Sequence, residues 1–343
     1  MMRALLLTDD LRLELGERAR PTVKSPHDVL VKIHQTGVCG TDRSVLVGKF
    51  SAEPGVVMGH EAVGEVVEIG PEVTALTPGD RVIVNPTLYC GRCDMCLRGQ
   101  TNFCHDKTGN EIGIDRDGSF ADYMVLEDRF LHLIPADVSY DRAVLTEPLA
   151  CALNNLDAAQ IPSAEPVVVI GAGPIGLVCA VAARHLGSAV TLIERDSFRR
   201  DHAHKLIDGF FTSGVDVVGA GSDDRPDRAP TVIDTVGNQL GLAIDLVEDA
   251  GSVVVMGYDS RAEATVRPLQ ILQRGLRVTG AGDYRGPHFP RAVELAARLP
   301  LERLISHRFT LEEHEDAFAV LAAAPETGYS ALKVVIQSAG ATE

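Results

Sequence analysis

The segment from residue 166 to residue 187 constrains the fold of this 343-residue chain more than any other. It reads PVVVIGAGPIGLVCAVAARHLG, a strand-like run followed by a glycine-rich turn and an amphipathic stretch. In a G-x-G-x-x-G turn the first glycine permits a tight bend, the second lets the backbone approach a pyrophosphate, and the third lets helix pack on strand. The turn contains Gly171, Gly173, Pro174, Ile175 and Gly176. Glycines and a proline interrupt the apolar run, so it predicts a strand, a turn and a helix at a dinucleotide site and not a membrane span.

Short apolar runs alternate with helical stretches after about residue 165. Such alternation predicts a doubly wound parallel sheet covered by helices. The strands expected from the sequence are 166–170, 188–193, 231–236, 251–257 and 276–282.

Before about residue 150 the pattern consists of Val- and Ile-rich runs separated by Gly, Pro and Asp, which is typical of a β-rich unit. These runs are 28–38, 61–70 and 80–86, and the last run of the chain, 330–337, is more similar to them than to the later strands. We therefore expect an α/β protein with a β-rich domain and a parallel-sheet domain, which suits this length.

Glu194 follows the second strand of the parallel sheet, twenty-three residues after Gly171. An acid at this point accepts hydrogen bonds from the ribose hydroxyls and repels a 2′-phosphate, so it favours NAD over NADP. Arg195, Arg199 and Arg200 come next. Each is either the solvated start of a helix or a group that contacts ribose or phosphate, and we expect Arg199 to lie at the cofactor site.

Four of the seven cysteines lie within fifteen residues, in the pattern C-x2-C-x2-C-x7-C. They are Cys90, Cys93, Cys96 and Cys104. Four thiolates on one compact loop match the closed tetrahedral geometry of a structural zinc. An iron–sulfur cluster takes the same four ligands and a redox pair takes two, but zinc is the favoured interpretation.

The acidic excess narrows the possible partners. The sequence has 48 Asp and Glu against 32 Lys and Arg, a net charge of −16. This charge repels phosphate backbones and anionic membranes, so neither nucleic acid nor a membrane is expected as a partner, and a zinc-binding nucleic-acid or scaffold protein is disfavoured. The N-terminus lacks the apolar stretch of a secretory signal, so we expect a cytoplasmic protein with reduced cysteines.

Two further fragments carry metal-ligand side chains, Cys39-Gly-Thr-Asp42 and Gly-His60-Glu61. Cysteine, histidine and carboxylate are the ligand types of an open zinc site, which leaves one position for substrate or water. Taken separately, Cys39 could be a small buried residue, His60 a hydrogen-bonded turn residue and Asp42 a helix cap.

In this order the motifs resemble the zinc-dependent medium-chain alcohol dehydrogenase superfamily over nearly the whole chain. The matching segments are CGTD at 39–42, GHE at 59–61, the cysteine lobe at 90–104, EPL at 147–149, GAGPIG at 171–176 and LKVVI at 332–336. The resemblance implies a GroES-like catalytic domain from residues 1–152 and 297–343, with the structural zinc lobe at 90–104, and a Rossmann NAD-binding domain at 153–296. It also implies a homodimer or homotetramer formed through the Rossmann domain.

The resemblance assigns the catalytic zinc ligands. Cys39 and His60 would bind the zinc, and Glu61 would be a third or an alternating ligand. Glu147 would fill the third protein-ligand position that some members give to cysteine. With the cysteine lobe, this implies two zinc ions per chain.

The resemblance also assigns residues that handle protons. Asp42 would hydrogen-bond the second nitrogen of His60, and Thr41 would accept the proton of the substrate hydroxyl. Several members, threonine dehydrogenases among them, have a histidine where this chain has Ser44, so the proton must leave by another route.

The implied reaction is hydride transfer between a secondary alcohol and NAD. The glutamate type of site is similar to polyol, sugar and aminocyclitol dehydrogenases, including the 2-deoxy-scyllo-inosamine dehydrogenases, and EPLACALN at 147–154 resembles the aminocyclitol enzymes. Arg43, Lys49 and Asn154 are candidate contacts to a polyhydroxylated substrate, each with an alternative as a surface or capping residue. A threonine- or simple-alcohol-type dehydrogenase is the alternative function.

Overall fold

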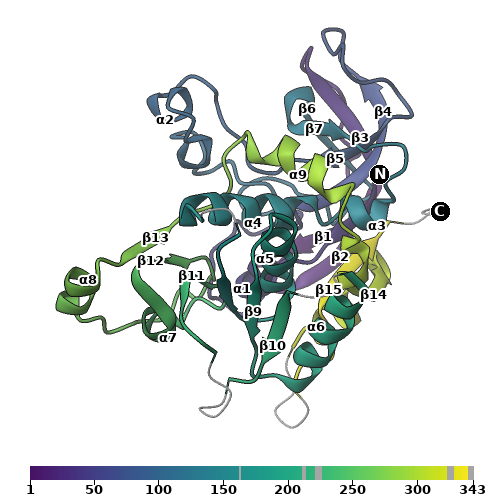
Figure 1. Ribbon diagram of the computed structural model, residues 1–343. Helices are drawn as coiled ribbons and strands as arrows, with labels where there is room; N and C mark the ends of the chain where they lie inside the picture. Colours follow the sequence, from purple (N-terminus) through teal and green to yellow (C-terminus); the bar gives the residue numbers. More distant parts are fainter. Residues whose placement is uncertain (162–163, 211–213, 221–225, 323–327, 339–343) are drawn as a thin grey trace. The chain divides into compact units, whose positions relative to one another are not determined.

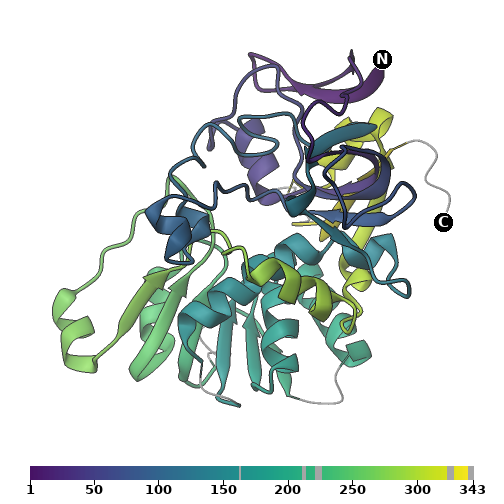
Figure 2. The same ribbon diagram turned by 90° about the horizontal axis from the view of Figure 1, so that it is seen from above.

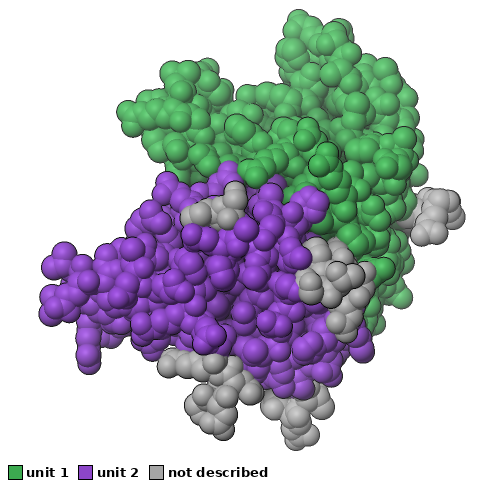
Figure 3. Space-filling model, in the orientation of Figure 1, with its two compact units in different colours: residues 1–147, 285–322, 333–343 green, residues 148–284, 323–332 purple. Residues whose placement is uncertain are grey.

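The computed structural model describes residues 1–161, 164–210, 214–220, 226–322 and 328–338. The chain forms two compact units, which Figure 3 colours separately. The first unit contains residues 1–147, 285–322 and 333–343, and the second contains residues 148–284 and 323–332.

The second unit is built on a parallel sheet with six strands in the described residues, in the order β10-β9-β8-β11-β12-β13 (Figure 1). Its strands are β8 (Val167–Ile170), β9 (Val190–Ile193), β10 (Val215–Val218), β11 (Ala229–Asp234), β12 (Val247–Val255) and β13 (Arg277–Gly280). The strand order reverses between β8 and β11, the kind of switch point where open α/β sheets bind their ligands. The predicted doubly wound sheet is confirmed.

Helices cover this sheet because its central strands, β8 and β11, are buried on both faces. The helices are α4 (Thr146–Ala159), which begins at the end of the first unit, α5 (Pro174–His185), α6 (Ser197–Phe210), α7 (Leu240–Leu246) and α8 (Pro268–Arg274). Helix α5 packs on β8 and β9, α6 on β10, and α7 on β11 and β12 (Figures 1 and 2). All four residues of β8 are buried.

The glycine turn has the geometry that its sequence predicts. Gly171 has a φ of +98°, a conformation that residues with a side chain rarely adopt. A Cβ atom on Gly176 would lie 1.9 Å from the carbonyl oxygen of Gly171, so only glycine lets helix α5 approach the strand this closely. Gly173 caps α5 and Pro174 is its first residue, where proline is favoured.

The first unit is built on a mixed sheet with seven strands in the part of the chain described, in the order β14-β15-β3-β4-β5-β7, with β6 also paired to β3. Its strands are β3 (Asp28–Gly37), β4 (Glu61–Ile69), β5 (Arg81–Val84), β6 (Tyr123–Glu127), β7 (Leu131–Leu133), β14 (Ile305–Thr310) and β15 (Lys333–Gln337). A separate hairpin joins β1 (Met2–Leu7) and β2 (Leu13–Arg18). Strand β15 pairs with β3, which confirms that the last run of the chain belongs with the early strands.

The helices of the first unit are short. They are α1 (Gly40–Leu46), α2 (Asp94–Leu97), α3 (Tyr140–Ala143), α9 (His288–Ala296) and α10 (His314–Ala319), with 3₁₀ turns at Thr101–Phe103, Asp128–Phe130, Leu301–Leu304 and Leu311–Glu313. Helix α9 packs on α3, and its Phe289 ring lies 4.9 Å from the ring of His132. The compact units divide at 147/148, 284/285, 322/323 and 332/333, whereas the sequence suggested a single insertion of residues 153–296.

The described helices include none with the length and apolar character to cross a membrane. The apolar segment 166–183 divides into β8, the glycine turn and α5, as its glycines predict.

Candidate functional site

Three of the predicted zinc ligands lie together in the first unit. Cys39 precedes α1, His60 precedes β4, and Glu61 is the first residue of β4. One ligand atom from each residue lies within 4.8 Å of the others. Cys39 and His60 are partly exposed and Glu61 is buried, so the cluster has both a dry side and an accessible side.

The start of helix α1 fixes the position of Cys39. The backbone N–H of Cys39 donates to Asp42 Oδ2 at 2.8 Å, and the N–H of Thr41 donates to Cys39 Sγ at 3.5 Å, which makes a capping box. Thr41 Oγ1 lies 3.7 Å from the same sulfur. The C-G-T-D sequence therefore places the thiol and the threonine hydroxyl side by side.

Asp42 also faces His60. Its Oδ1 lies 3.7 Å from His60 Nδ1, and among the described residues neither atom has a hydrogen-bond partner. Burial raises the pKa of Asp42. Burial opposes the charged form of His60, but Asp42, Cys39 and Glu147 together hold the pKa of His60 well above its ordinary value. Because Nδ1 faces the carboxylate, Nε2 is the nitrogen left to bind a metal.

Glu147 lies at the edge of this cluster. It stands in the first turn of α4 and is close enough to raise the pKa of both His60 and Lys333. Among the described residues it is not part of the group whose ligand atoms lie within 4.8 Å. The structure therefore places Glu61 nearer to Cys39 and His60 than Glu147.

Lys333 is a residue of this site that the sequence reasoning did not single out. It is buried at the start of β15 and forms an ion pair with Glu61. The sequence does contain an indication of this buried ion pair. Lys333 is the one charged residue in the apolar run Leu-Lys-Val-Val-Ile at 332–336, and a lysine in a buried strand is rare unless it has a partner of opposite charge.

The four clustered cysteines form a second site in the first unit. Their sulfur atoms lie within 4.8 Å of one another. Backbone N–H groups point at the sulfurs, for example from Cys93 to Cys90 Sγ at 3.3 Å and from Cys96 to Cys93 Sγ at 3.5 Å. Hydrogen bonds from the backbone of His105 and Cys96 lower the pKa of Cys93 to about 6. Such bonds favour the thiolate form that binds metal.

Both clusters fit a zinc ion by the chemistry of their donors. The lobe offers four thiols, which suits a closed structural site, whereas the first cluster offers a thiol, an imidazole and a carboxylate, which suits an open one. None of the seven cysteines, which all lie in the part of the chain that the structure describes, forms a disulfide. Cys179 is buried, as predicted, and burial raises its pKa to about 12, whereas Cys151 is only partly buried.

The predicted cofactor residues surround the glycine turn of the second unit. Glu194 is buried, and its carboxylate accepts hydrogen bonds from the N–H of Ala172 at 2.8 Å and of Asp196 at 2.9 Å. A Cβ on Gly173 would lie 3.5 Å from an Arg199 nitrogen, so this guanidinium stands beside the turn. Arg199 also stacks on the ring of Tyr329, with 3.4 Å between the guanidinium carbon and the ring centroid.

Two residues considered for substrate or proton contacts have local partners. The Asn154 amide nitrogen donates to the carbonyls of Ala281 at 3.2 Å and Asp283 at 3.0 Å, so this side chain ties α4 to that segment. The Ser44 hydroxyl donates to the Gly40 carbonyl one helical turn earlier, at 2.9 Å.

Comparison with known proteins agrees with this geometry. Residues 25–136 match the alcohol dehydrogenase GroES-like domain, and residues 174–298 match the zinc-binding dehydrogenase family. A sorbitol dehydrogenase from Halalkalibacterium halodurans is 31% identical over 312 residues, which is 88% of this chain and 90% of that protein.

Solved structures with the same fold extend the comparison. A protein from Sinorhizobium meliloti 1021, described as a zinc-binding dehydrogenase and bound to NADP, is 32% identical with a TM-score of 0.87 over 98% of this chain and 99% of its own. Galactitol-1-phosphate dehydrogenase from Escherichia coli is 26% identical with a TM-score of 0.85 over 98% of this chain and 100% of its own.

The two metal clusters should respond differently to loss of one cysteine. Replacing Cys39 by Ala should remove one zinc per chain and leave the fold intact, because an open site holds little structure together. Replacing Cys93 by Ala should remove the other zinc and lower the melting temperature by several degrees or more, because the loop depends on its metal. Zinc content and thermal unfolding measure both effects.

Cys151→Ala is the matched control and should keep both zinc ions. Equal losses of melting temperature in Cys39→Ala and Cys93→Ala would contradict this division between an open site and a structural site.

Proposed function

Because this chain belongs to the zinc-dependent medium-chain alcohol dehydrogenases, NAD(P)-dependent enzymes that act on CH–OH groups, we propose that its substrate is a polyol, a sugar or an aminocyclitol. The proposed reaction moves a hydride between NAD and a secondary alcohol or its ketone. The observation that carries it is the open cluster of Cys39, His60 and Glu61, with the Glu147 carboxylate close enough to influence His60. The resemblance to the family implies that Glu147 fills the ligand position that some members give to cysteine. The identity to a sorbitol dehydrogenase supports the polyol class.

The residues of the cluster have distinct parts in this proposal. A zinc ion held by Cys39, His60 and a carboxylate would lower the pKa of an alcohol hydroxyl and so prepare the carbon for hydride loss. Thr41, whose hydroxyl lies beside the Cys39 sulfur, is the proposed acceptor of the alcohol proton. The Asp42 carboxylate faces Nδ1 of His60, and the attraction between them favours one orientation of the imidazole ring.

The proton route argues against a threonine-type substrate. In that type a histidine stands at the position of Ser44, and the Ser44 hydroxyl here donates to its own helix. Threonine is therefore disfavoured as the substrate. A threonine- or simple-alcohol-type dehydrogenase remains the alternative that the resemblance to the family implies.

A substrate panel tests the proposed class. Polyols, hexoses, aminocyclitols, threonine and simple alcohols are offered with NAD, and nicotinamide absorbance is followed. We expect kcat/KM for at least one polyhydroxylated compound to exceed that for threonine and ethanol by tenfold or more, the effect of about 1.4 kcal/mol of added transition-state binding.

The Cys39→Ala protein is the blank for this panel, because any turnover that survives it does not come from the proposed site. Turnover of threonine or a simple alcohol without turnover of any polyol, sugar or aminocyclitol would refute the substrate class.

We propose NAD as the preferred cofactor, although a relative binds NADP. Glu194 supports NAD because its buried carboxylate stands at the glycine turn, where it would repel a 2′-phosphate. Arg199 beside Gly173 is the proposed contact to the cofactor's phosphate or ribose.

Replacing Glu194 by Gln removes the charge and keeps one of the two acceptor oxygens, so one of the bonds from Ala172 and Asp196 is lost. Because the repulsion of the 2′-phosphate disappears, the Kd for NADP should fall relative to that for NAD. Glu194→Ala also removes the acceptor, and the Kd for NAD should rise roughly tenfold. Fluorescence titration with each cofactor measures these values.

Asp201→Asn changes an exposed acid on helix α6, which begins three residues after Glu194, and is the control for a general change of charge. An unchanged ratio of the NAD and NADP dissociation constants in both Glu194 variants would show that this carboxylate does not select the cofactor.

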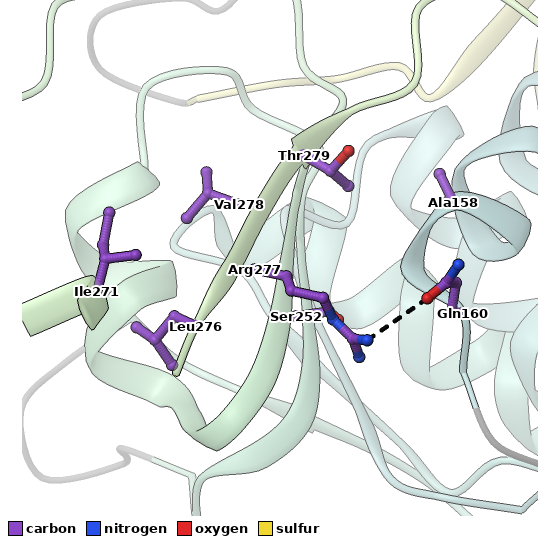
Figure 4. Close-up of a pocket in the computed structure, with 8 residues that line it drawn as sticks. All are labelled: Ala158, Gln160, Ser252, Ile271, Leu276, Arg277, Val278 and Thr279. Carbon is purple, nitrogen blue, oxygen red and sulfur yellow. Dashed lines mark hydrogen bonds between the residues drawn. The ribbon is translucent and has the colours of Figure 1, made fainter. Parts of the chain in front are cut away.

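We propose that two copies of the chain associate through β13. Among the described strands it is the last in its sheet, and apolar side chains stand exposed around it, with Val278 40%, Leu269 60% and Leu272 77% exposed. A pocket adjoins this strand, and Figure 4 shows Val278, Ile271 and Leu276 on one side of it. On the other side Arg277 Nη1 donates a hydrogen bond to Gln160 Oε1 at 3.4 Å. An unpaired strand edge with apolar neighbours is suited to pairing with a second copy about a two-fold axis.

Sedimentation velocity tests this association. The wild-type protein should sediment as a dimer or tetramer, and Val278→Asp should shift it to a smaller species because a charge would enter the interface. Leu186→Asp, an exposed leucine elsewhere in the second unit, should leave the mass unchanged. A monomeric wild-type protein would refute the proposal.

We further propose a cytoplasmic location. None of the seven cysteines, which all lie among the described residues, forms a disulfide, and five of them belong to the two metal clusters, which need reduced thiols. Fractionation of cells that express the chain tests this, and recovery outside the cytoplasm would contradict it.

A further inference from the structure

A buried ion pair stands directly behind the open metal cluster. The side chains of Lys333 and Glu61 are 3% and 2% exposed and are in contact through Lys333 Nζ and Glu61 Oε2. A lysine is almost never withdrawn from water to this extent without a partner, because an ammonium in a dry site loses its hydration.

Three neighbouring strands build the space for this pair. Glu61 begins β4, Lys333 begins β15, and Gly37 at the end of β3 lies between them, opposite Glu61. A Cβ atom on Gly37 would lie 2.2 Å from Glu61 Oε2 and 2.9 Å from Lys333 Cε. The two side chains therefore fill the volume that any larger residue at position 37 would need.

Lys333 also contacts the backbone next to the first metal ligand. Its Nζ donates to the carbonyl of Val38 at 3.0 Å, and the N–H of Val38 donates to the carbonyl of Val334 at 2.9 Å. Cys39 is the next residue. The ammonium thus joins the strand end that carries Cys39 to the carboxylate of Glu61.

The same carboxylate belongs to the metal cluster. A Glu61 oxygen lies within 4.8 Å of the ligand atoms of Cys39 and His60, while Oε2 is in contact with Lys333. A zinc ion in this cluster and the ammonium would therefore compete for one negative charge. In a dry environment the attraction between the ammonium and the carboxylate is strong, and so is the repulsion between two cations.

We propose that Lys333 is a positioning residue that draws the charge of Glu61 away from the catalytic zinc and thereby weakens Glu61 as a ligand. This inference rests on the zinc site of the proposed function. Its consequence is that the third ligand position falls to Glu147, so that Glu61 is held in reserve behind the metal.

Zinc release from the full-length, zinc-loaded protein tests the inference. A chromogenic chelator follows the release, and the phase that is missing in Cys39→Ala identifies the catalytic zinc. Lys333→Met keeps the length of the side chain and removes its charge, so Glu61 should bind zinc fully and release of this zinc should slow roughly tenfold, as for coupled charges in contact. Lys333→Arg keeps the charge and should release zinc at the wild-type rate.

The double variant Lys333→Met/Glu61→Gln removes both charges and separates this role from a structural one. Its release rate should return toward that of the wild type, because no carboxylate remains to be freed. Circular dichroism and thermal unfolding of each variant verify the fold, and the double variant keeps the test informative if the single one unfolds, since it leaves no buried unpaired charge.

A second measurement reports the ligands directly. With cobalt(II) in the catalytic site, Lys333→Met should change the visible d–d bands, because Glu61 would enter the coordination shell, whereas Lys333→Arg should not.

Three results decide the matter. Slower release in Lys333→Met that the double variant reverses supports the inference. Release at or above the wild-type rate, with unchanged cobalt bands in a folded protein, overturns it. If Cys39→Ala removes no zinc, the catalytic zinc site of the proposed function fails instead, and the two failures are distinguishable.

Discussion

A carboxylate leaves water only when hydrogen bonds or an opposite charge replace its hydration, and this constraint shapes the sites of both units. Asp42 is fully buried and is held by a backbone N–H and an imidazole. Glu61 is neutralised by Lys333. In the second unit, Glu194 accepts two backbone N–H groups, and Asp234 at the end of β11 accepts three at 2.9 Å. The ends of strands and the first turn of α1 therefore hold these charged groups at fixed positions, which is what both metal and nucleotide binding require.

The features that the sequence predicted correctly depend on neighbours along the chain. Gly176 must be a glycine because the carbonyl oxygen of Gly171 lies where a Cβ atom would stand. The G-x-G-x-x-G spacing of the sequence predicts this requirement. The cysteines of 90–104 gather because each thiol is only a few residues from the next. Cys39 and His60 are different, since twenty-one residues separate them and only the resemblance to a family placed them in one site. The parallel sheet and the pairing of the last strand followed from apolar runs of the right length.

The features that could not be predicted depend on partners far apart in the chain. The countercharge of Glu61 lies more than 270 residues away, and no local pattern identifies such a partner. Helix α9 shows an apolar face, but a face alone does not say whether it covers the first unit or the second. Strand β2 was not predicted because only one of its six residues is buried, and β10 was not predicted because none of its four residues is buried. Asn154 was considered for a substrate contact because a polar residue beside a motif does not reveal that its amide is already bonded.

The position of β15 in the chain has a consequence for the order of assembly. All six described strands of the parallel sheet lie between residues 167 and 280, so that sheet is complete on a growing chain before residue 333 has been made. The mixed sheet starts with residue 28 and needs β15 beside β3. During synthesis the second unit can fold first. Until β15 has been made, Cys39 and Glu61 of the open cluster lack the Lys333 ammonium. The metal centre therefore reaches its final charge only after residue 333 has been added and β15 has paired with β3.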